Sequence, residues 1–309
     1  MDGVLVIDKP AGPTSHDVVA RMRKVLKEKK VGHTGTLDPA ATGVLPLVLG
    51  SATKVARYLT GSHKMYRAHI RLGITTTTLD GEGEVQSEQP VTVSEAEARA
   101  AALSFVGEIE QIPPMYSAKK VDGTRLYKLA RQGVEVEREA KRVSIFSLDV
   151  VSVELPELTI DVRCSAGTYV RVLARDIGEK LGTGGHLRLL RRLAAGPFTL
   201  EEAIPLQQAI DDPASVRARV VPIQKALAML PRIAVPADIG RMIRDGYQLS
   251  VADLRNLDTP SFALDEPLAL SLDGGELVAV ARSLIASVDL PTSRRDERAL
   301  KTERVFGRA

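Results

Sequence analysis

The first residues of the chain alternate between apolar runs and polar, turn-forming segments. Residues 4–7 form an apolar run that ends at Asp8-Lys9-Pro10, which predicts a strand followed by a loop. From Ser15 onward, apolar residues recur at helical spacing as far as Leu26. This pattern predicts an amphipathic helix with Ser15 as its N-cap. The opposite face of this helix carries a cluster of basic residues between positions 21 and 30.

Farther along, strand-like and helix-like periods are mixed. Residues 65–72 alternate between two faces, as in a strand, and Tyr66 lies on the more apolar face. Residues 94–105 have a helical pattern that begins with a capping box of Ser94 and Glu97. The same reasoning predicts strands at 143–153 and 158–165 and helices at 53–59, 126–133 and 169–181. Several strands are neighbours in sequence, so we expect an α+β fold with a mixed, mostly antiparallel sheet.

A stretch rich in glycine and proline spans residues 32–47. Asp38 lies in a loop of this stretch, directly before Pro39, and an apolar run at 44–49 follows. Glycine permits positive φ, and proline fixes its own φ and restricts the residue before it. Asp38 therefore has few backbone conformations, and a carboxylate held in this way could serve in catalysis at the edge of a sheet. An ordinary Asp-Pro turn is the alternative that this pattern leaves open. A second polar loop, residues 75–83, contains four consecutive threonines.

Five prolines punctuate the stretch from residue 204 to residue 236. Proline breaks regular elements, so this stretch is typical of a connection between two folded units. We place the domain boundary at Arg232, which gives a large domain of residues 1–231 and a small domain of residues 232–309. The small domain contains short apolar segments separated by glycine and charge, which indicates a β-rich unit.

The composition argues against several kinds of site. The 309 residues are 44% apolar, which is enough for a sizeable core, yet no apolar run approaches the ~20 residues of a membrane span. The sequence starts without a signal-peptide pattern, so we expect a cytoplasmic protein. Cys164 is the single cysteine, and the five histidines show no metal-ligand spacing, so neither a disulfide nor a metal site is expected.

The charge distribution is more informative than the net charge of +3. Basic residues gather at 21–30 and again at 294–309, whereas acidic residues gather at 80–97. Local basic surface, with the acidic balance elsewhere, would attract a polyanion to one face of the protein. The alternative is that both basic segments are simply solvated helical or terminal surfaces.

Six distinctive sequence blocks lie between residues 3 and 200. The most distinctive block is Gly32-His33-Thr34-Gly35-Thr36-Leu37-Asp38-Pro39, continued by Ala41-Thr42-Gly43-Val44-Leu45-Pro46. The other blocks are Asp8-Lys9-Pro10 with Thr14-Ser15-His16, Lys64-x-Tyr66-x-Ala68, Ile112 to Lys120, Gly167-Thr168-Tyr169-Val170-Arg171 and Leu189-Leu190-Arg191-Arg192. In this order the blocks resemble the bacterial tRNA pseudouridine-55 synthases of the TruB family, and six ordered blocks are far more specific than one short motif.

The resemblance implies a pseudouridine synthase fold with a central active-site cleft and a PUA-like RNA-binding domain at the C-terminal end. It also implies that a uridine in the T-loop of tRNA is flipped out and isomerised to pseudouridine, without metal or cofactor. The implied partner is the T-arm of tRNA, and no membrane or obligate protein partner is expected. We expect a monomer, and assistance with tRNA folding as an accompanying role is left open.

By the same resemblance, Asp38 matches the family's catalytic aspartate and Arg171 the arginine that pairs with it. Tyr66 matches the tyrosine that contacts the flipped base and could accept or relay the C5 proton. The residues that the resemblance assigns to substrate binding are His33, Tyr66, Tyr169, Leu190 and Lys9. For Lys9, support of the catalytic loop is an alternative to contact with phosphate. For Leu190, packing in the core is an alternative to closing over the uracil.

Three other readings compete with this one. A non-catalytic RNA-binding protein could share the fold, but it would not need Asp38, Arg171 and Tyr66 together. A nucleoside or glycoside hydrolase usually needs two carboxylates around the scissile bond, and the nearest candidates in sequence are Asp80 and Glu82. A synthase that works in a guide-RNA particle is a third possibility.

Overall fold

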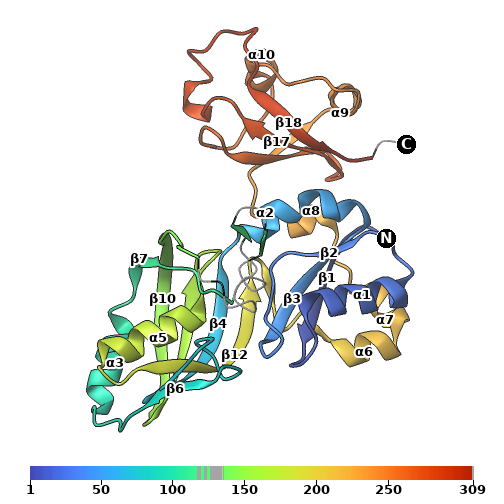
Figure 1. Cartoon of the computed structure of the whole chain (residues 1–309). Coiled ribbons are helices and arrows are strands. Elements are labelled where there is room, and N and C mark those ends of the chain that lie inside the picture. Colours follow the sequence, from blue (N-terminus) through green and yellow to red (C-terminus); the bar gives the residue numbers. More distant parts are fainter. Residues whose placement is uncertain (117–119, 122–123, 126–133, 135, 308–309) are drawn as a thin grey trace.

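A mixed, ten-stranded sheet forms the framework of the molecule in the computed structural model, which describes residues 1–116, 120–121, 124–125, 134 and 136–307 (Figure 1). Most neighbouring strands are antiparallel, and the parallel pairs are β1 with β14 and β3 with β12. The predicted mixed, mostly antiparallel sheet is confirmed. In sheet order, the strands on the main path are β14 (Ile204–Pro205), β1 (Gly3–Lys9), β3 (Thr42–Leu49), β12 (Gly185–Ala195), β4 (Lys64–Leu72), β11 (Glu157–Cys164), β10 (Lys141–Glu154) and β7 (Gly107–Gln111). Off this path, β2 (Val31–His33) pairs with β3, and β13 (Phe198–Thr199) pairs with β12.

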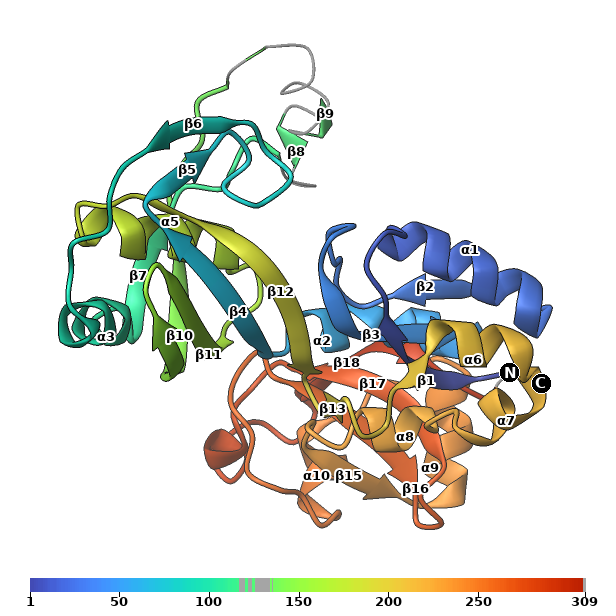
Figure 2. The ribbon, with the colours of Figure 1, turned by 90° about the horizontal axis from the view of Figure 1, so that it is seen from below.

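Helices cover the two halves of this sheet separately. Helices α1 (Ser15–Leu26) and α6 (Leu206–Asp211) pack on the half built from β1 and β3, and α3 (Glu95–Leu103) and α5 (Val170–Lys180) on the half built from β10 and β11 (Figure 2). Each half has its own apolar cluster, and both clusters reach Tyr66 and Leu190, on β4 and β12. Strands β4 and β12 therefore lie where the two halves of the sheet meet, and they carry the residues that contact both apolar clusters. The remaining helices of this region are η1 (Gly50–Val55), α2 (Ala56–Thr60), α7 (Pro213–Ala218) and α8 (Ile223–Ala226).

Most predicted elements coincide closely with the observed ones, with two differences. The helix predicted at 53–59 is the 3-10 helix η1 as far as Val55 and the α-helix α2 from Ala56 onward, and the start of α1 differs. Thr14, not Ser15, is the N-cap, and it forms a capping box with Asp17. The Ser15 hydroxyl instead reaches across to the loop that contains Asp38. The capping box of Ser94 and Glu97 is present as predicted. The helix expected at 126–133 lies outside the described residues. Two small antiparallel pairs, β5 (Ile74–Thr76) with β6 (Val85–Glu88) and β8 (Lys120–Val121) with β9 (Thr124–Arg125), flank the large sheet.

A second, four-stranded sheet begins at Arg232, where the sequence predicts the boundary. Its strands follow one another in the order β15 (Arg232–Val235), β16 (Pro267–Leu272), β17 (Leu277–Ser283) and β18 (Leu300–Val305). Helices α9 (Ala237–Arg244) and α10 (Val251–Arg255) and the short η2 (Ser287–Asp289) complete this C-terminal unit. No helix among the described residues is long and apolar enough to cross a membrane.

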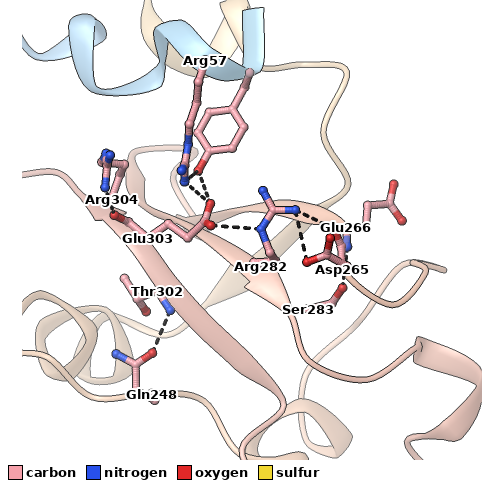
Figure 3. A network of polar contacts seen from close by, with 10 residues as sticks. Arg57, Gln248, Asp265, Glu266, Arg282, Ser283, Thr302, Glu303 and Arg304 are labelled. Carbon is pink, nitrogen blue, oxygen red and sulfur yellow. Dashed lines mark hydrogen bonds and ion pairs between the residues drawn. The ribbon is translucent and has the colours of Figure 1, made fainter. Parts of the chain in front are cut away.

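The C-terminal unit docks on α2 and α8 through one apolar cluster and one polar network. Phe306 and residues of β16 and β17 share a buried cluster with Leu59 and with residues of α8. Beside it, Glu303 pairs with Arg57 and accepts a hydrogen bond from the Tyr58 hydroxyl, and its other oxygen accepts from Arg282 Nε at 3.0 Å (Figure 3). A single carboxylate thus joins α2 of the large unit to β17 and β18 of the small one.

Candidate active site

Asp38 lies in the loop between β2 and β3, and half of its side chain is exposed (50%). The backbone just before it is held by Ser15. The Ser15 hydroxyl donates to Leu37 O at 3.0 Å and accepts from Leu37 N at 2.9 Å, and Ser15 is buried. Both hydrogen-bonding groups of the residue before the carboxylate are therefore satisfied by one side chain of α1. This arrangement fixes the direction in which Asp38 leaves the loop.

Lys9 holds the same loop through hydrogen bonds to its backbone. Its side chain is fully buried, and Nζ donates to Pro10 O at 2.9 Å, Pro39 O at 3.0 Å and Ala41 O at 2.7 Å. Burial lowers the pKa of this amine to about 8. All three donors of the ammonium are used by backbone oxygens, and none is left for phosphate. These contacts favour the alternative of loop support over contact with phosphate.

Arg171 joins the Asp38 loop to a second acidic loop. It lies in the first turn of α5, and only 8% of its side chain is exposed. One guanidinium nitrogen pairs with Asp38 Oδ2, and the other donates to Asp80 Oδ2 at 3.0 Å. The predicted partnership of Asp38 with Arg171 is present in the structure. Since both arms of the guanidinium are engaged, neither Arg171 nor the Asp38 carboxylate can rotate independently.

Asp80 is a site residue that the sequence analysis considered only for hydrolysis. Its Oδ1 accepts from the Thr78 hydroxyl at 2.5 Å, and its backbone oxygen accepts from the Thr76 hydroxyl at 2.7 Å. The turn is joined to β12 by Leu187 N, which donates to Leu79 O, and by Gly81 N, which donates to Leu187 O, both at 3.0 Å. The run of threonines was a signal for side-chain hydrogen bonding within a tight loop. It did not indicate that the loop would reach Arg171.

A cavity of about 310 Å³ opens beside Asp38, between the two halves of the large sheet. It is lined by Tyr66 of β4, by Leu190 of β12 and by Tyr169, which directly precedes α5. Asp38 and Arg171 line it as well. The structure thus brings together five of the seven residues singled out from the sequence. Burial raises the pKa of the Tyr66 hydroxyl, and the positive charge of Arg192 opposes that rise.

Tyr169 is held at the mouth of this cavity by its backbone. It directly precedes the first residue of α5, and the Gln111 side chain forms hydrogen bonds with both its backbone N–H and its backbone C=O. Tyr169 N donates to Gln111 Oε1 at 2.9 Å, and Gln111 Nε2 donates to Tyr169 O at 3.2 Å. Gln111 is almost completely buried. Its amide therefore fixes the helix start from which both Tyr169 and Arg171 project, a role that no pattern in the sequence indicated.

His33 ends β2 and lies outside the residues that line the cavity. Its ring makes an edge-to-face contact with the ring of His16, with 5.2 Å between the centroids and 78° between the planes. Burial, with smaller contributions from the charges of His16 and Arg192, lowers the pKa of His33 to about 4. The imidazole is therefore neutral near pH 7, a form suited to stacking on a nucleobase.

The described residues contain no group of three or more acidic, histidine or cysteine side chains that could hold a metal ion. Cys164 is buried on β11, and burial raises the pKa of its thiol to about 11. A thiolate nucleophile at this position would be scarce near pH 7. The cavity is lined by the half-exposed Asp38 carboxylate with its arginine partner, two tyrosines, several apolar side chains, and the buried cations Lys64 and Arg192. That set can attack or stabilise an electrophilic carbon while it encloses a flat, polar ring.

Comparisons with known proteins agree with this geometry. The family model "TruB family pseudouridylate synthase (N terminal domain)" matches residues 23–170, and "tRNA pseudouridylate synthase B C-terminal domain" matches residues 171–228. The protein named tRNA pseudouridine synthase B of Syntrophus aciditrophicus is 41% identical over 99% of this chain and 99% of its own. Its namesake from Clostridium kluyveri is 47% identical over 81% of this chain and 86% of its own.

A solved structure described as a Cbf5-Nop10-Gar1 complex superposes on 99% of this chain and 85% of its own, with a TM-score of 0.80 and 29% identity. The predicted pseudouridine synthase fold is therefore confirmed along nearly the whole chain. The chain belongs to the TruB family of pseudouridylate synthases.

Proposed function

We propose that this enzyme isomerises the uridine at position 55, in the T-loop of tRNA, to pseudouridine. The observation that carries the proposal is the half-exposed Asp38 carboxylate, fixed by Arg171 at the mouth of a cavity that two tyrosines line. The similarity to proteins named tRNA pseudouridine synthase B over most of the chain supports tRNA as the substrate.

The reaction breaks the bond between uridine N1 and ribose C1′, turns the uracil and joins its C5 to C1′. The target base must first leave the RNA stack, and the cavity beside Asp38 gives it a place to enter. Asp38 then acts at the ribose, either as a nucleophile at C1′ or as the base of an elimination, and Arg171 keeps its carboxylate oriented. Tyr66 and Tyr169 enclose the detached ring, and Tyr66 handles the C5 proton.

The position of Asp80 disfavours the hydrolase alternative. A hydrolase of that class needs one carboxylic acid that can give its proton to the leaving group and a second carboxylate across the bond. Asp80 has one oxygen on Arg171 and the other on the Thr78 hydroxyl. Both oxygens are occupied by donors that belong to the protein, which suits a support for Arg171 better than an acid catalyst.

We further propose that the protein acts alone, as a monomer in the cytoplasm, with a catalytic domain of residues 1–231 and a PUA-like domain of residues 232–309 that holds a distant part of the tRNA. Similarity along full-length relatives named as tRNA enzymes favours a substrate recognised without a guide RNA. The four-stranded sheet that begins at β15 supports the division of the chain.

The test is release of tritium from tRNA labelled at uridine C5, with wild-type protein and with Asp38→Asn, and without any guide RNA. We expect release by the wild type, no detectable release by the variant, and tRNA binding by both. The mass of the tRNA should remain unchanged apart from the exchanged label. Free uracil and an abasic site would instead indicate a hydrolase, and the absence of any reaction by wild-type protein that binds tRNA would refute the proposed activity.

A further inference from the structure

Arg192 is a buried cation whose guanidinium is held by backbone oxygens of the catalytic loop. Only 1% of the residue is exposed. Nε donates to Val44 O at 2.6 Å, one terminal nitrogen to Gly35 O at 3.1 Å and the other to Thr36 O at 3.4 Å. The strand that carries it lies very close to β3, where a Cβ on Gly43 would stand 2.2 Å from Arg192 O. Both the guanidinium and the backbone of Arg192 are therefore held in place.

No carboxylate of the described residues forms an ion pair with Arg192, although the guanidinium lines the cavity. Burying a positive charge without a counterion is unfavourable, even after the protein relaxes. Carbonyl oxygens satisfy its N–H groups but leave a net positive charge. By contrast, Arg171 has two carboxylate partners, and the neighbouring Arg191 pairs with Asp8 at 2.7 Å. Arg192 therefore brings uncompensated positive charge to the cavity.

Tyr66 faces this charge across the middle of the sheet. In the pairing of β12 with β4, Arg192 lies directly opposite Tyr66, so both side chains project from the same face. Leu190 lies opposite Ala68 in the same ladder, one step farther along that face. The charges of Asp38 and of Cys164 on β11 also act on the Tyr66 hydroxyl. The other titratable or charged side chains that line the cavity are Tyr169, Arg171 and Lys64 of β4, whose ammonium donates to Thr60 O at 2.5 Å.

We propose that Arg192 is a positioning residue for Tyr66, whose guanidinium compensates the negative charge that the Tyr66 oxygen carries during proton transfer. The inference rests on the proposed function and adds to it the group that stabilises the charged form of Tyr66. When the C1′–N1 bond breaks, its electron pair stays on uracil N1. The Tyr66 hydroxyl gives its proton to N1 and becomes a phenolate. C5 then bonds to C1′ with the electron pair of its C5–C6 double bond, while Asp38 either leaves C1′ or returns the proton it took from the ribose. The phenolate takes the proton from C5, and the electron pair of that C–H bond restores the C5–C6 double bond.

The chemistry explains why a cation is needed at this point. Burial alone makes a phenol a poorer acid, because it disfavours the charged form, and that would oppose transfer of the proton to N1. A fixed positive charge in a water-poor cavity reverses part of this cost without any reorganisation during the reaction. The proton that leaves C5 is replaced on the ring by the proton at N1, so Tyr66 is regenerated and no external acid or base is consumed.

The experiment compares wild type, Arg192→Gln and Arg192→Lys in single-turnover reactions with tRNA that carries hydrogen or deuterium at uridine C5. For Arg192→Gln we expect a rate about a hundredfold lower, and a C5 isotope effect clearly above that of the wild type, because proton removal has become limiting. Arg192→Lys retains the charge and should retain the isotope effect of the wild type. Arg191→Gln, one residue along on the other face, is the matched control.

A slower Arg192→Gln enzyme without an increased isotope effect would mean that Arg192 only supports the loop, and would overturn the inference. If Arg192→Gln does not fold, Arg192→Lys decides, because it keeps the positive charge and loses the guanidinium hydrogen bonds to the loop. A single-turnover rate within a few-fold of the wild type supports the inference, and a rate lower by about a hundredfold with an unchanged isotope effect overturns it. A wild-type enzyme that forms no pseudouridine would refute the proposed function instead, before any variant is compared.

Discussion

Asp80 accepts a hydrogen bond from Arg171 at 3.0 Å, on the same guanidinium that pairs with Asp38. Only 18% of the Asp80 side chain is exposed, whereas half of Asp38 is. The two carboxylates are therefore unequal: one is anchored in a threonine-rich turn, and the other faces the cavity. Because Arg171 bonds to both carboxylates, the anchored Asp80 helps to hold the exposed Asp38 carboxylate in place.

Replacing Asp80 should therefore slow catalysis more than it weakens tRNA binding. For Asp80→Asn we expect the single-turnover rate to fall roughly tenfold to a hundredfold, as for other residues that orient a reacting group through a partner. The dissociation constant for tRNA should change little. Thr78→Val removes the other partner of Asp80 and is expected to have a smaller effect in the same direction. An Asp80→Asn enzyme with the rate of the wild type would contradict this role.

Lys9 should matter to stability and rate together. Lys9→Met removes three hydrogen bonds to backbone oxygens, of which the bond to Ala41 O is buried and the other two are partly buried, so we expect a loss of about 2–3 kcal/mol in the free energy of unfolding. Two of these oxygens flank the turn after Asp38, so the rate should fall as well. The exposed Lys24 is the control, because Lys24→Met should leave the denaturant midpoint unchanged. Equal midpoints for the two variants would contradict the loop-support role.

The central strands and the Asp38 loop could be predicted from the sequence because their signals are local. Alternation at 65–72 predicts β4 (Lys64–Leu72) to within one residue, and the Gly/Pro pattern predicts a constrained loop at Asp38. The cap of α1 was assigned one residue too late because serine is the better N-cap by residue type, and it directly follows Thr14. Only the fold shows that the Ser15 hydroxyl is used by Leu37 instead.

Asp80, Gln111 and the role of Arg192 could not be predicted, because each depends on contacts between segments far apart in the chain. Asp80 reaches Arg171 only after its turn has joined β12. Arg191 and Arg192 look identical in sequence, yet strand alternation turns one toward Asp8 and the other into the cavity. A motif indicates that both arginines matter, but the register of β12 against β4 decides which one faces Tyr66.

Glu303 should control how firmly the C-terminal unit is held. It contacts Arg57, Tyr58 and Arg282, and only 13% of its side chain is exposed. Glu303→Gln leaves two arginines without their shared counterion, so we expect a loss of about 1–2 kcal/mol in the free energy of unfolding. Limited proteolysis should also cut faster near Pro231, where the two units join.

The control for Glu303 is Asp296, whose ion pair with Arg294 is exposed on both sides (83% and 76% for the arginine and the aspartate). Asp296→Asn should change neither the unfolding midpoint nor the rate of proteolysis, because exposed pairs contribute little. If Glu303→Gln behaves like Asp296→Asn, the apolar cluster around Phe306 holds the two units together without help from the network.

His33 should make the folded protein sensitive to mild acid. Its pKa is lowered to about 4 by burial and by the charges of His16 and Arg192, whereas an unfolded histidine titrates near its ordinary value of 6.5. The unfolded chain therefore binds the proton more tightly. The stability associated with neutral His33 is complete above 6.5 and is lost as the pH falls through about 4. We expect wild-type protein to lose more thermal stability than His33→Gln between about pH 7.5 and about pH 5, in unfolding scans at constant ionic strength. Equal losses in the two proteins would show that His33 protonates in the folded state as easily as in the unfolded one.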